Sequence, residues 1–209
     1  LLFGRERKPK LIQLFPNHNF LYMSQLAHSE FGKLKTVFLK KASAAFINEE
    51  HIQQYWESLN YLGKPDINKA LAEYDAFENI LKEHGAEVLY FPTDASVNMD
   101  SIYCRDAAIA TSHGMIICNM GKEGRKNEPA AQAHAYAEQG IPVLGSIIAP
   151  GTVEGGDVAW LDANTLAVGN TYRTNEAGMQ QLKELLHPIG VKVITADMPH
   201  YKGPSDVFH

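Results

Sequence analysis

The sequence has few cysteines and no long apolar run. Only Cys104 and Cys118 occur among its 209 residues, which is too few for a disulfide framework. No stretch of 18 or more apolar residues is present, so no membrane-spanning helix is predicted. The N-terminus also lacks the apolar segment of a secretory signal peptide. These absences favour a reducing, cytoplasmic compartment and give no reason to expect a membrane as partner.

Positive charge is not in excess either. The formal net charge is −5 at pH 7, and both signs are interspersed along the chain. Nucleic-acid-binding surfaces usually show clustered lysine and arginine, whereas here only residues 5–10 are locally basic, which we interpret as a solvated segment. The histidines show no zinc-site spacing, and there is no Walker A loop and no G-x-G-x-x-G run after a first strand. We therefore expect no nucleic-acid partner, no metal and no cofactor.

A repeat of about 50 residues is present instead. Three amphipathic segments are each followed by a glycine and an apolar, β-type segment, as expected where glycine ends a helix and a strand begins. The segments and their glycines are 67–84 with Gly85, 128–139 with Gly140, and 175–186 with Gly190. Two predicted β-hairpins, at 105–118 and 156–168, precede the second and third of these helices. The repeating unit is therefore strand, strand, helix, strand.

Equivalent acids mark the start of successive units. Asp106, Asp157 and Asp206 are about 50 residues apart, and Asp206 begins a copy that the sequence does not complete. Residues 34–39 predict the first strand of a more divergent copy, and 41–64 predict an insertion or lid. Units of this size pack against their neighbours, and radial packing would bring equivalent side chains to a common centre. The alternative is a doubly wound open sheet, which also alternates strands and helices.

The most informative short run is Glu154-Gly155-Gly156-Asp157, in which two carboxylates flank two glycines. Glycine lets backbones approach closely, and a carboxylate that opens an apolar strand needs a partner or hydrogen bonds. Asp106 opens an apolar strand in the preceding unit in the same way. The run is either part of a site or a surface turn with solvated acids, and the spacing alone leaves both interpretations open.

The two cysteines are interpreted as packed residues. Cys104 lies two residues before Asp106, so the two side chains would share one face of a strand. A thiol there could be a nucleophile, but a neighbouring carboxylate raises the thiol pKa and weakens it. Cys118 lies in an apolar run and is assigned to the core.

Two arginines occupy matching places before helices. Arg125 precedes the second repeated helix and Arg173 the third, where Thr174 and Asn175 supply N-cap chemistry. An arginine beside a helix N-terminus suits a carboxylate ligand, because a guanidinium binds a carboxylate through two parallel hydrogen bonds. The alternative is two surface ion pairs, each worth at most about 1 kcal/mol. The matching positions favour a shared site.

Four runs resemble one enzyme superfamily, that of the dimethylarginine dimethylaminohydrolases, arginine deiminases and amidinotransferases. In the order found in that family, they are Tyr103-Cys104-Arg105-Asp106, Glu154-Gly155-Gly156-Asp157-Val158, Val168-Gly169-Asn170-Thr171-Tyr172-Arg173-Thr174-Asn175 and Asp206-Val207-Phe208-His209. The resemblance implies a pentein-type, five-bladed α/β-propeller of strand-strand-helix-strand modules around a central pocket. It also implies a cysteine nucleophile, a histidine acid/base and acids that hold a guanidinium.

The resemblance assigns roles to individual residues. Asp106 matches the aspartate that binds the guanidinium. Glu154 matches the acid that positions the catalytic histidine and the guanidinium, and His209 matches that histidine. Arg125 and Arg173 match arginines that hold the α-carboxylate of the substrate.

The implied chemistry is hydrolysis of a C–N bond in a guanidino substrate such as arginine or dimethylarginine. Carboxylates hold the planar cation in one orientation, with Asp157 either a further wall of the site or a structural acid. A thiolate attacks the guanidino carbon to give a covalent thiouronium intermediate, and an imidazole gives the leaving amine its proton. Water then completes hydrolysis, whereas a second amine completes amidino transfer, the alternative reaction on this scaffold.

The sequence departs from the superfamily pattern at its C-terminal end. The family's nucleophilic cysteine lies C-terminal to the histidine, whereas this sequence stops at His209. We therefore expect residues 1–209 to form a single α/β-propeller domain, of about three modules and the start of a fourth, whose C-terminal part lies beyond this sequence. That piece alone would be inactive, and a catalytically incomplete guanidino-binding protein is a third hypothesis.

A second departure concerns the branch of the superfamily. Arg105 stands where dimethylarginine hydrolases often carry an acid, which favours the deiminase or transferase branch. The compact spacing of the motifs favours the dimethylarginine hydrolases. A homodimer is compatible with each of these interpretations.

Overall fold

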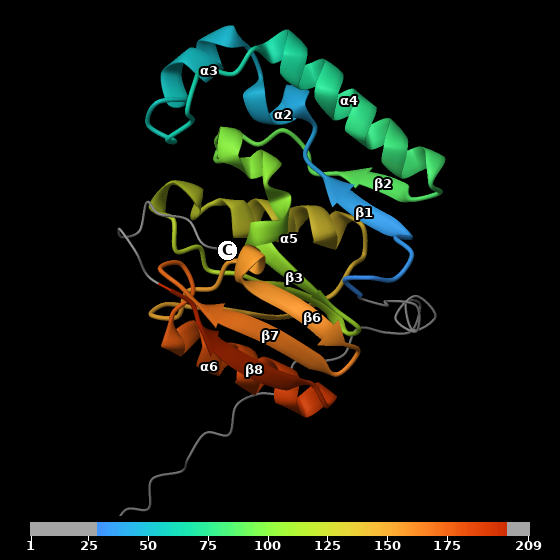
Figure 1. Cartoon of the computed structure of the whole chain (residues 1–209), viewed down its shortest axis with the longest axis vertical. Coiled ribbons are helices and arrows are strands. Elements are labelled where there is room, and N and C mark those ends of the chain that lie inside the picture. Colours follow the sequence, from blue (N-terminus) through green and yellow to red (C-terminus); the bar gives the residue numbers. More distant parts are fainter. Residues whose placement is uncertain (1–28, 200–209) are drawn as a thin grey trace, which may run out of the picture.

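The structure consists of small sheets joined to helices. A computed structural model describes residues 29–199 (Figure 1). Within this range three sheets are present, with strand orders β1-β2, β3-β4-β5 and β6-β7-β8. The helices of the same range include none that is long and apolar enough to cross a bilayer.

The second and third units have the same topology. In each, two antiparallel strands form a hairpin, a helix follows, and a third strand pairs in parallel with the second strand of the hairpin. The elements of the second unit are β3 (Ala108–Thr111), β4 (Gly114–Ile117), α5 (Glu128–Glu138) and β5 (Val143–Ser146). Those of the third unit are β6 (Val158–Asp162), β7 (Thr165–Asn170), α6 (Glu176–Leu186) and β8 (Lys192–Asp197). The predicted strand-strand-helix-strand repeat is confirmed for these two units.

The first unit is more divergent. Strands β1 (Thr36–Leu39) and β2 (Glu87–Tyr90) pair in parallel. Between them lie α2 (Ala42–Phe46), α3 (Glu49–Tyr55) and α4 (Ile67–Glu83). In the described range this sheet has two strands, and β1 takes the place that β4 and β7 hold in the later units. The segment 41–64, predicted as an insertion or lid, contains α2 and α3, and α3 lies with α4 at the top of the molecule in Figure 1, above α2.

Glycines and caps set the ends of the helices. Gly85, Gly140 and Gly190 have φ angles of 82°, 68° and 78°. These lie in the left-handed region, which glycine adopts without a Cβ penalty. Gly85 and Gly140 follow the ends of α4 and α5 as predicted, whereas α6 ends at Leu186 and Gly190 ends the 3-10 turn His187–Ile189 that follows it. The side chains of Asp66 and Asn175 accept backbone N–H bonds at the starts of α4 and α6.

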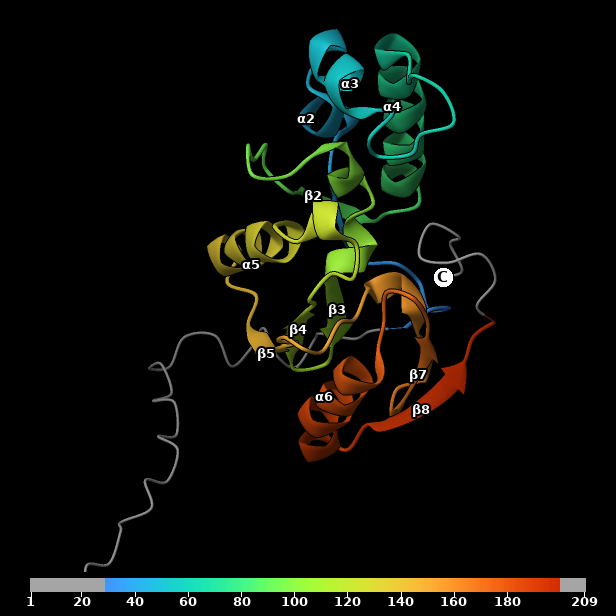
Figure 2. The ribbon, with the colours of Figure 1, turned by 90° about the vertical axis from the view of Figure 1, so that its left-hand side faces the viewer.

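Helices and sheets alternate along the molecule. Tyr136 and Ala135 of α5 pack against Phe38 of β1 and Phe91 after β2 on one side, and against Ile117 of β4 on the other. Helix α5 therefore lies between the first and second sheets, as Figure 2 shows. Burial of these apolar side chains is the main favourable contribution at this contact.

Helix α6 repeats this arrangement one unit later. Leu182 and Leu186 pack in one cluster with Ile116 of the second sheet and with Trp160 and Leu166 of the third. Each helix thus covers one face of its own sheet and one face of the preceding sheet. By contrast, the outer face of the third sheet is largely exposed, including its apolar side chains Leu161 and Ile194.

Short 3-10 turns connect these layers. They are η1 (Met99–Ile102), η2 (Cys104–Ala107), η3 (Glu123–Arg125), η4 (Gly155–Asp157) and η5 (His187–Ile189). The prediction that Asp106 and Asp157 lie in the strands is wrong, because η2 and η4 precede β3 and β6. The prediction that Cys104 shares a strand face with Asp106 is wrong for the same reason, since the tighter turn directs the two side chains to different neighbours.

Candidate active site

A close backbone contact joins the turns that carry the two repeated aspartates. A Cβ atom at Gly155 would lie 2.1 Å from the carbonyl oxygen of Arg105, so a larger residue would push the turns apart. The glycine predicted to allow close approach therefore has that role between two units. The contact holds Asp106 of η2 and Asp157 of η4 at the same end of their sheets.

Asp106 belongs to a buried ion-pair cluster. Arg125 donates from Nη1 to Asp106, from Nε and Nη2 to Glu128 at 2.8 and 2.7 Å, and from Nη2 to the Tyr103 carbonyl oxygen at 2.9 Å. The Arg125 side chain is only 3% exposed. Burial raises the pKa of Glu128 above its usual value, although Arg125 opposes this shift. The structure thus places Arg125 on two carboxylates of the protein itself, and its predicted contact with a substrate carboxylate stays a prediction.

Glu154 lies at the centre of a second polar group. It is 0% exposed and accepts hydrogen bonds from the Lys122 backbone N–H at 2.9 Å and from Arg173 Nη1 at 3.0 Å. A buried carboxylate needs such partners, because burial penalises its charged form. The predicted site residues Glu154 and Arg173 are therefore direct neighbours in space.

Asp157 fixes the loop that carries Arg173. Its Oδ2 atom accepts hydrogen bonds from the hydroxyls of Thr171 and Thr174 at 2.8 and 2.6 Å. The same loop lies against Gly121, where a Cβ would be 2.6 Å from the Arg173 Cα atom. Of the two predicted roles for Asp157, these contacts support the structural acid.

Asp100 was not singled out from the sequence, yet it lies in the same region. It is 3% exposed on η1 and accepts a 2.5 Å hydrogen bond from Lys122 Nζ. Because the Lys122 backbone also binds Glu154, this lysine links the two acids. An acid in a short turn six positions before Asp106 was the available signal, but only the fold shows that it is buried.

Acidic groups outnumber basic ones in this connected region. Lys122 and Arg125 join its two halves through η3, because one binds Asp100 and Glu154 and the other binds Asp106. The acids are Asp100, Asp106, Glu128, Glu154 and Asp157, and the bases are Lys122, Arg125 and Arg173. Within the described part of the chain the region therefore carries excess negative charge, which favours a cationic ligand.

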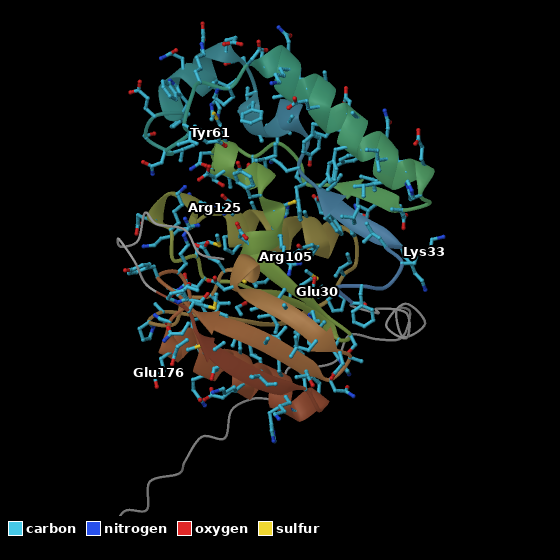
Figure 3. All side chains as sticks on the ribbon, viewed as in Figure 1. Glu30, Lys33, Tyr61, Arg105, Arg125 and Glu176 are labelled. Carbon is cyan, nitrogen blue, oxygen red and sulfur yellow. The ribbon has the colours of Figure 1, made fainter. Side chains whose placement is uncertain are left out.

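Arg105 points away from this region. It donates to Glu30 at 3.1 Å and to the Val158 carbonyl oxygen at 2.9 Å, and Figure 3 shows Arg105 and Glu30 together, away from Arg125. The Arg105 side chain is 58% exposed. Its positive charge therefore does not enter the acidic region, and the prediction about the enzyme branch that rested on Arg105 stays a prediction.

Neither cysteine has the surroundings of an activated thiolate. Cys104 is half-buried, packs beside the α5 cluster and contacts the Phe38 carbonyl oxygen at 3.5 Å, and burial raises its pKa. Cys118 is 3% exposed in the core, and burial also raises its pKa. Both are packed residues, as predicted. The predicted catalytic His209, like Asp206, lies outside the described residues.

Comparisons with known proteins agree with this picture. Residues 37–209 match the family model described as N,N dimethylarginine dimethylhydrolase, eukaryotic. The chain is 36% identical over 132 residues to the N(G),N(G)-dimethylarginine dimethylaminohydrolase of Streptomyces coelicolor, covering 63% of this chain and 50% of that protein. It therefore spans about half the length of this curated relative.

Two further comparisons extend the similarity. The arginine deiminase of Streptococcus pyogenes is 35% identical over 82 residues, which is 39% of this chain and 20% of that protein. A crystal structure of a dimethylarginine dimethylaminohydrolase adduct with S-methyl-L-thiocitrulline superposes with a TM-score of 0.64 at 25% identity, covering 81% of this chain and 63% of that one. The family match extends over most of the sequence, so the chain belongs to the N,N-dimethylarginine dimethylhydrolase family of guanidino-group-modifying enzymes.

Proposed function

We propose that these residues form much of the active site of a hydrolase that cleaves a C–N bond of a guanidino substrate such as arginine or dimethylarginine. The observation that carries the proposal is the excess of buried acids around Asp100, Asp106 and Glu154, beside Arg173. A guanidinium is a planar cation, and paired carboxylates bind it through charge-assisted hydrogen bonds. The family and the thiocitrulline adduct of a similar protein support the same substrate class.

The residues have separate roles in this proposal. Asp106 and Glu154 bind the guanidinium, and Glu154 also orients His209. Arg173 holds the substrate carboxylate, as the superfamily motif implies. Asp157 fixes the loop that carries Arg173 through its hydrogen bonds to Thr171 and Thr174. Arg125 has four hydrogen bonds within the protein and serves mainly to position Asp106, with any contact to the substrate carboxylate secondary.

The reaction follows a cysteine-histidine mechanism, with the nucleophilic cysteine beyond residue 209. Its thiolate forms a bond to the guanidino carbon, and the C–N bond to the leaving amine breaks as His209 gives that amine a proton. Water then adds to the thiouronium carbon and gives a proton to the histidine. The C–S bond breaks, which releases a urea-type product and regenerates the thiolate.

The remaining modules would complete a propeller around this site. Helices α5 and α6 each cover the open face of the preceding sheet. The apolar residues Leu161 and Ile194 on the third sheet are exposed, so we propose that the helix of a fourth module covers them in the same way. The single-domain, five-module arrangement that the superfamily resemblance implies would repeat the contacts of α5 with the first sheet and of α6 with the second.

Product analysis of the full-length protein tests this function. The protein is incubated with L-arginine or with dimethyl-L-arginine, each with and without an amine acceptor. We expect citrulline together with ammonia or dimethylamine, independent of the acceptor. Products that require the acceptor would identify an amidinotransferase, and binding without turnover would identify an incomplete guanidino-binding protein. The proposal would be refuted if the protein neither bound nor turned over any guanidino compound.

A further inference from the structure

Lys122 combines a fixed backbone with a long, partly exposed side chain. Its backbone N–H donates to the buried Glu154 at 2.9 Å, and the nearby Met120 is 1% exposed in the core. Its ammonium donates to Asp100 Oδ2 at 2.5 Å, and 26% of its side chain is exposed. A lysine has a flexible alkyl stem, so the ammonium reaches solvent by rotation of side-chain bonds alone. It can therefore leave Asp100 while the backbone keeps its contact with Glu154.

The two arginines of the region are held more firmly. The Arg125 side chain is 3% exposed and donates four hydrogen bonds to acceptors of the protein. The Arg173 side chain is 15% exposed, pairs with Glu154 and lies on the loop that Asp157 fixes. Lys122 is thus the most exposed of the three bases and the one whose charge is most easily moved.

Asp100 needs a compensating cation when no substrate is bound. Its side chain is only 4% exposed, and an uncompensated buried carboxylate strongly destabilises a protein. Among the described residues, Lys122 is the base that forms an ion pair with Asp100. The free protein therefore carries its own counter-ion on one of the acids that would attract a guanidinium.

We propose that the Lys122 ammonium is an exchangeable counter-ion, which the guanidinium of the substrate displaces from Asp100. The inference rests on the proposed function, because it takes the guanidinium to bind among Asp100, Asp106 and Glu154. A guanidinium binds a carboxylate through two parallel hydrogen bonds, whereas an ammonium is a compact point charge. The ammonium is strongly hydrated, so its release into solvent offsets part of the lost ion pair.

The exchange depends on the charge of the ligand. A guanidinium leaves Asp100 compensated when the ammonium departs, whereas a neutral urea group of similar shape does not. Hydrolysis converts the first group into the second, so the ammonium returns to Asp100 once the product has formed. Lys122 therefore weakens the binding of the substrate and favours the release of the product.

The test compares a cationic and a neutral ligand of similar shape in the full-length protein. KM is measured for L-arginine or dimethyl-L-arginine, and the inhibition constant for L-citrulline. Lys122→Met removes the counter-ion, Lys122→Arg replaces it with one that binds a carboxylate more tightly, and Lys126→Met is the control because its ion pair with Glu123 is exposed.

The two ligands should respond differently. In Lys122→Met we expect KM to fall by about fivefold and the inhibition constant of L-citrulline to change by less than about twofold, because only the cation gains a free carboxylate. In Lys122→Arg we expect KM to rise. The control should change neither quantity.

Thermal unfolding supplies a second measurement. Lys122→Met leaves Asp100 uncompensated, so the Tm of the free variant should fall, and the substrate should raise Tm more in the variant than in the wild type. If Lys122→Met does not fold, Lys122→Arg decides, and an unchanged or lower KM in that variant overturns the inference.

Other outcomes also overturn it. A higher or unchanged KM in Lys122→Met would show that the lysine only holds Asp100 in place. An equal fall of KM and of the L-citrulline inhibition constant would show that the bulk of the side chain matters rather than its charge. A wild-type protein that neither binds nor turns over a guanidino compound refutes the proposed function as well, so the two failures are distinguishable.

Discussion

Arg125→Met removes a cation that holds two buried acids in place. The side chains of Arg125 and Glu128 are 3% and 2% exposed, so water cannot replace the lost hydrogen bonds. Removing one partner of a buried ion pair typically destabilises a protein by about 3–5 kcal/mol. For a domain of this size 1 kcal/mol lowers Tm by about 2–4 °C, so we expect a fall of roughly 10 °C. Methionine matches the length of the arginine side chain as far as the Nε atom, which limits the loss of packing.

The assays are urea unfolding, for the free energy, and thermal unfolding, for Tm, both followed by circular dichroism, with Lys126→Met as the control. Lys126 forms an ion pair with Glu123 in the same turn, but the two side chains are 51% and 84% exposed. An exposed pair is worth about 0–1 kcal/mol, so the control should change stability little. A double variant, Arg125→Met with Glu128→Leu, should recover part of the loss because it removes one uncompensated charge. A loss in Arg125→Met no larger than in the control would refute the reasoning.

The pH dependence gives an independent check of the same cluster. Burial raises the pKa of Glu128 in the folded protein, so the folded state holds this proton more tightly than the unfolded chain does. The contribution of Glu128 to stability therefore falls as pH rises from its usual pKa through its folded value. In Arg125→Met the Glu128 pKa rises further, because the opposing cation is absent. We expect the stability difference between variant and wild type to narrow as pH is lowered from 7.5 to about 4.5, and a constant difference would contradict this.

Three further predictions concern the full-length protein. Asp106→Asn should reduce turnover at least about 100-fold, because a neutral amide cannot stabilise a buried cation, and near-normal kcat would remove Asp106 from the site. Arg173→Ala should raise KM at least tenfold for L-arginine relative to agmatine, which lacks the carboxylate; an equal loss for both would argue against this role. Gly155→Ala should lower Tm by several degrees, because its Cβ would lie 2.1 Å from the Arg105 carbonyl oxygen, and an unchanged Tm would show that the two turns separate freely.

The repeat was predictable because it rests on local signals. A glycine after an amphipathic segment ends a helix whatever the tertiary fold, so the ends of α4 and α5 agree with the pattern within one or two residues, and a 3-10 turn separates the end of α6 from Gly190. The hairpins of the second and third units follow from apolar runs on either side of turn residues. The 3-10 turns before β3 and β6 were not predictable, since a few residues of apolar sequence look alike as a strand end or a turn.

The site was predictable only in part. Asp106, Glu154 and Arg173 stand out because they occupy repeated positions and match the motifs of a known superfamily. Asp100 and Lys122 do not repeat, and the position of Asp100 shortly before Asp106 is a weak signal until the fold shows that Asp100 is 3% exposed. The pairing of Arg125 with acids of the protein itself was not predictable either. The sequence does not show that its partner Glu128, at the start of α5, is buried beside it.

The alternation of helices and sheets has a consequence for synthesis on the ribosome. Each sheet leaves one apolar face uncovered until the helix of the following unit is made, because α5 shields the first sheet and α6 the second. In a nascent chain the apolar face of the most recently completed sheet is therefore exposed until the helix of the next unit is made. Rapid elongation, or a chaperone bound to this exposed apolar face, would protect the unfinished polypeptide from self-association.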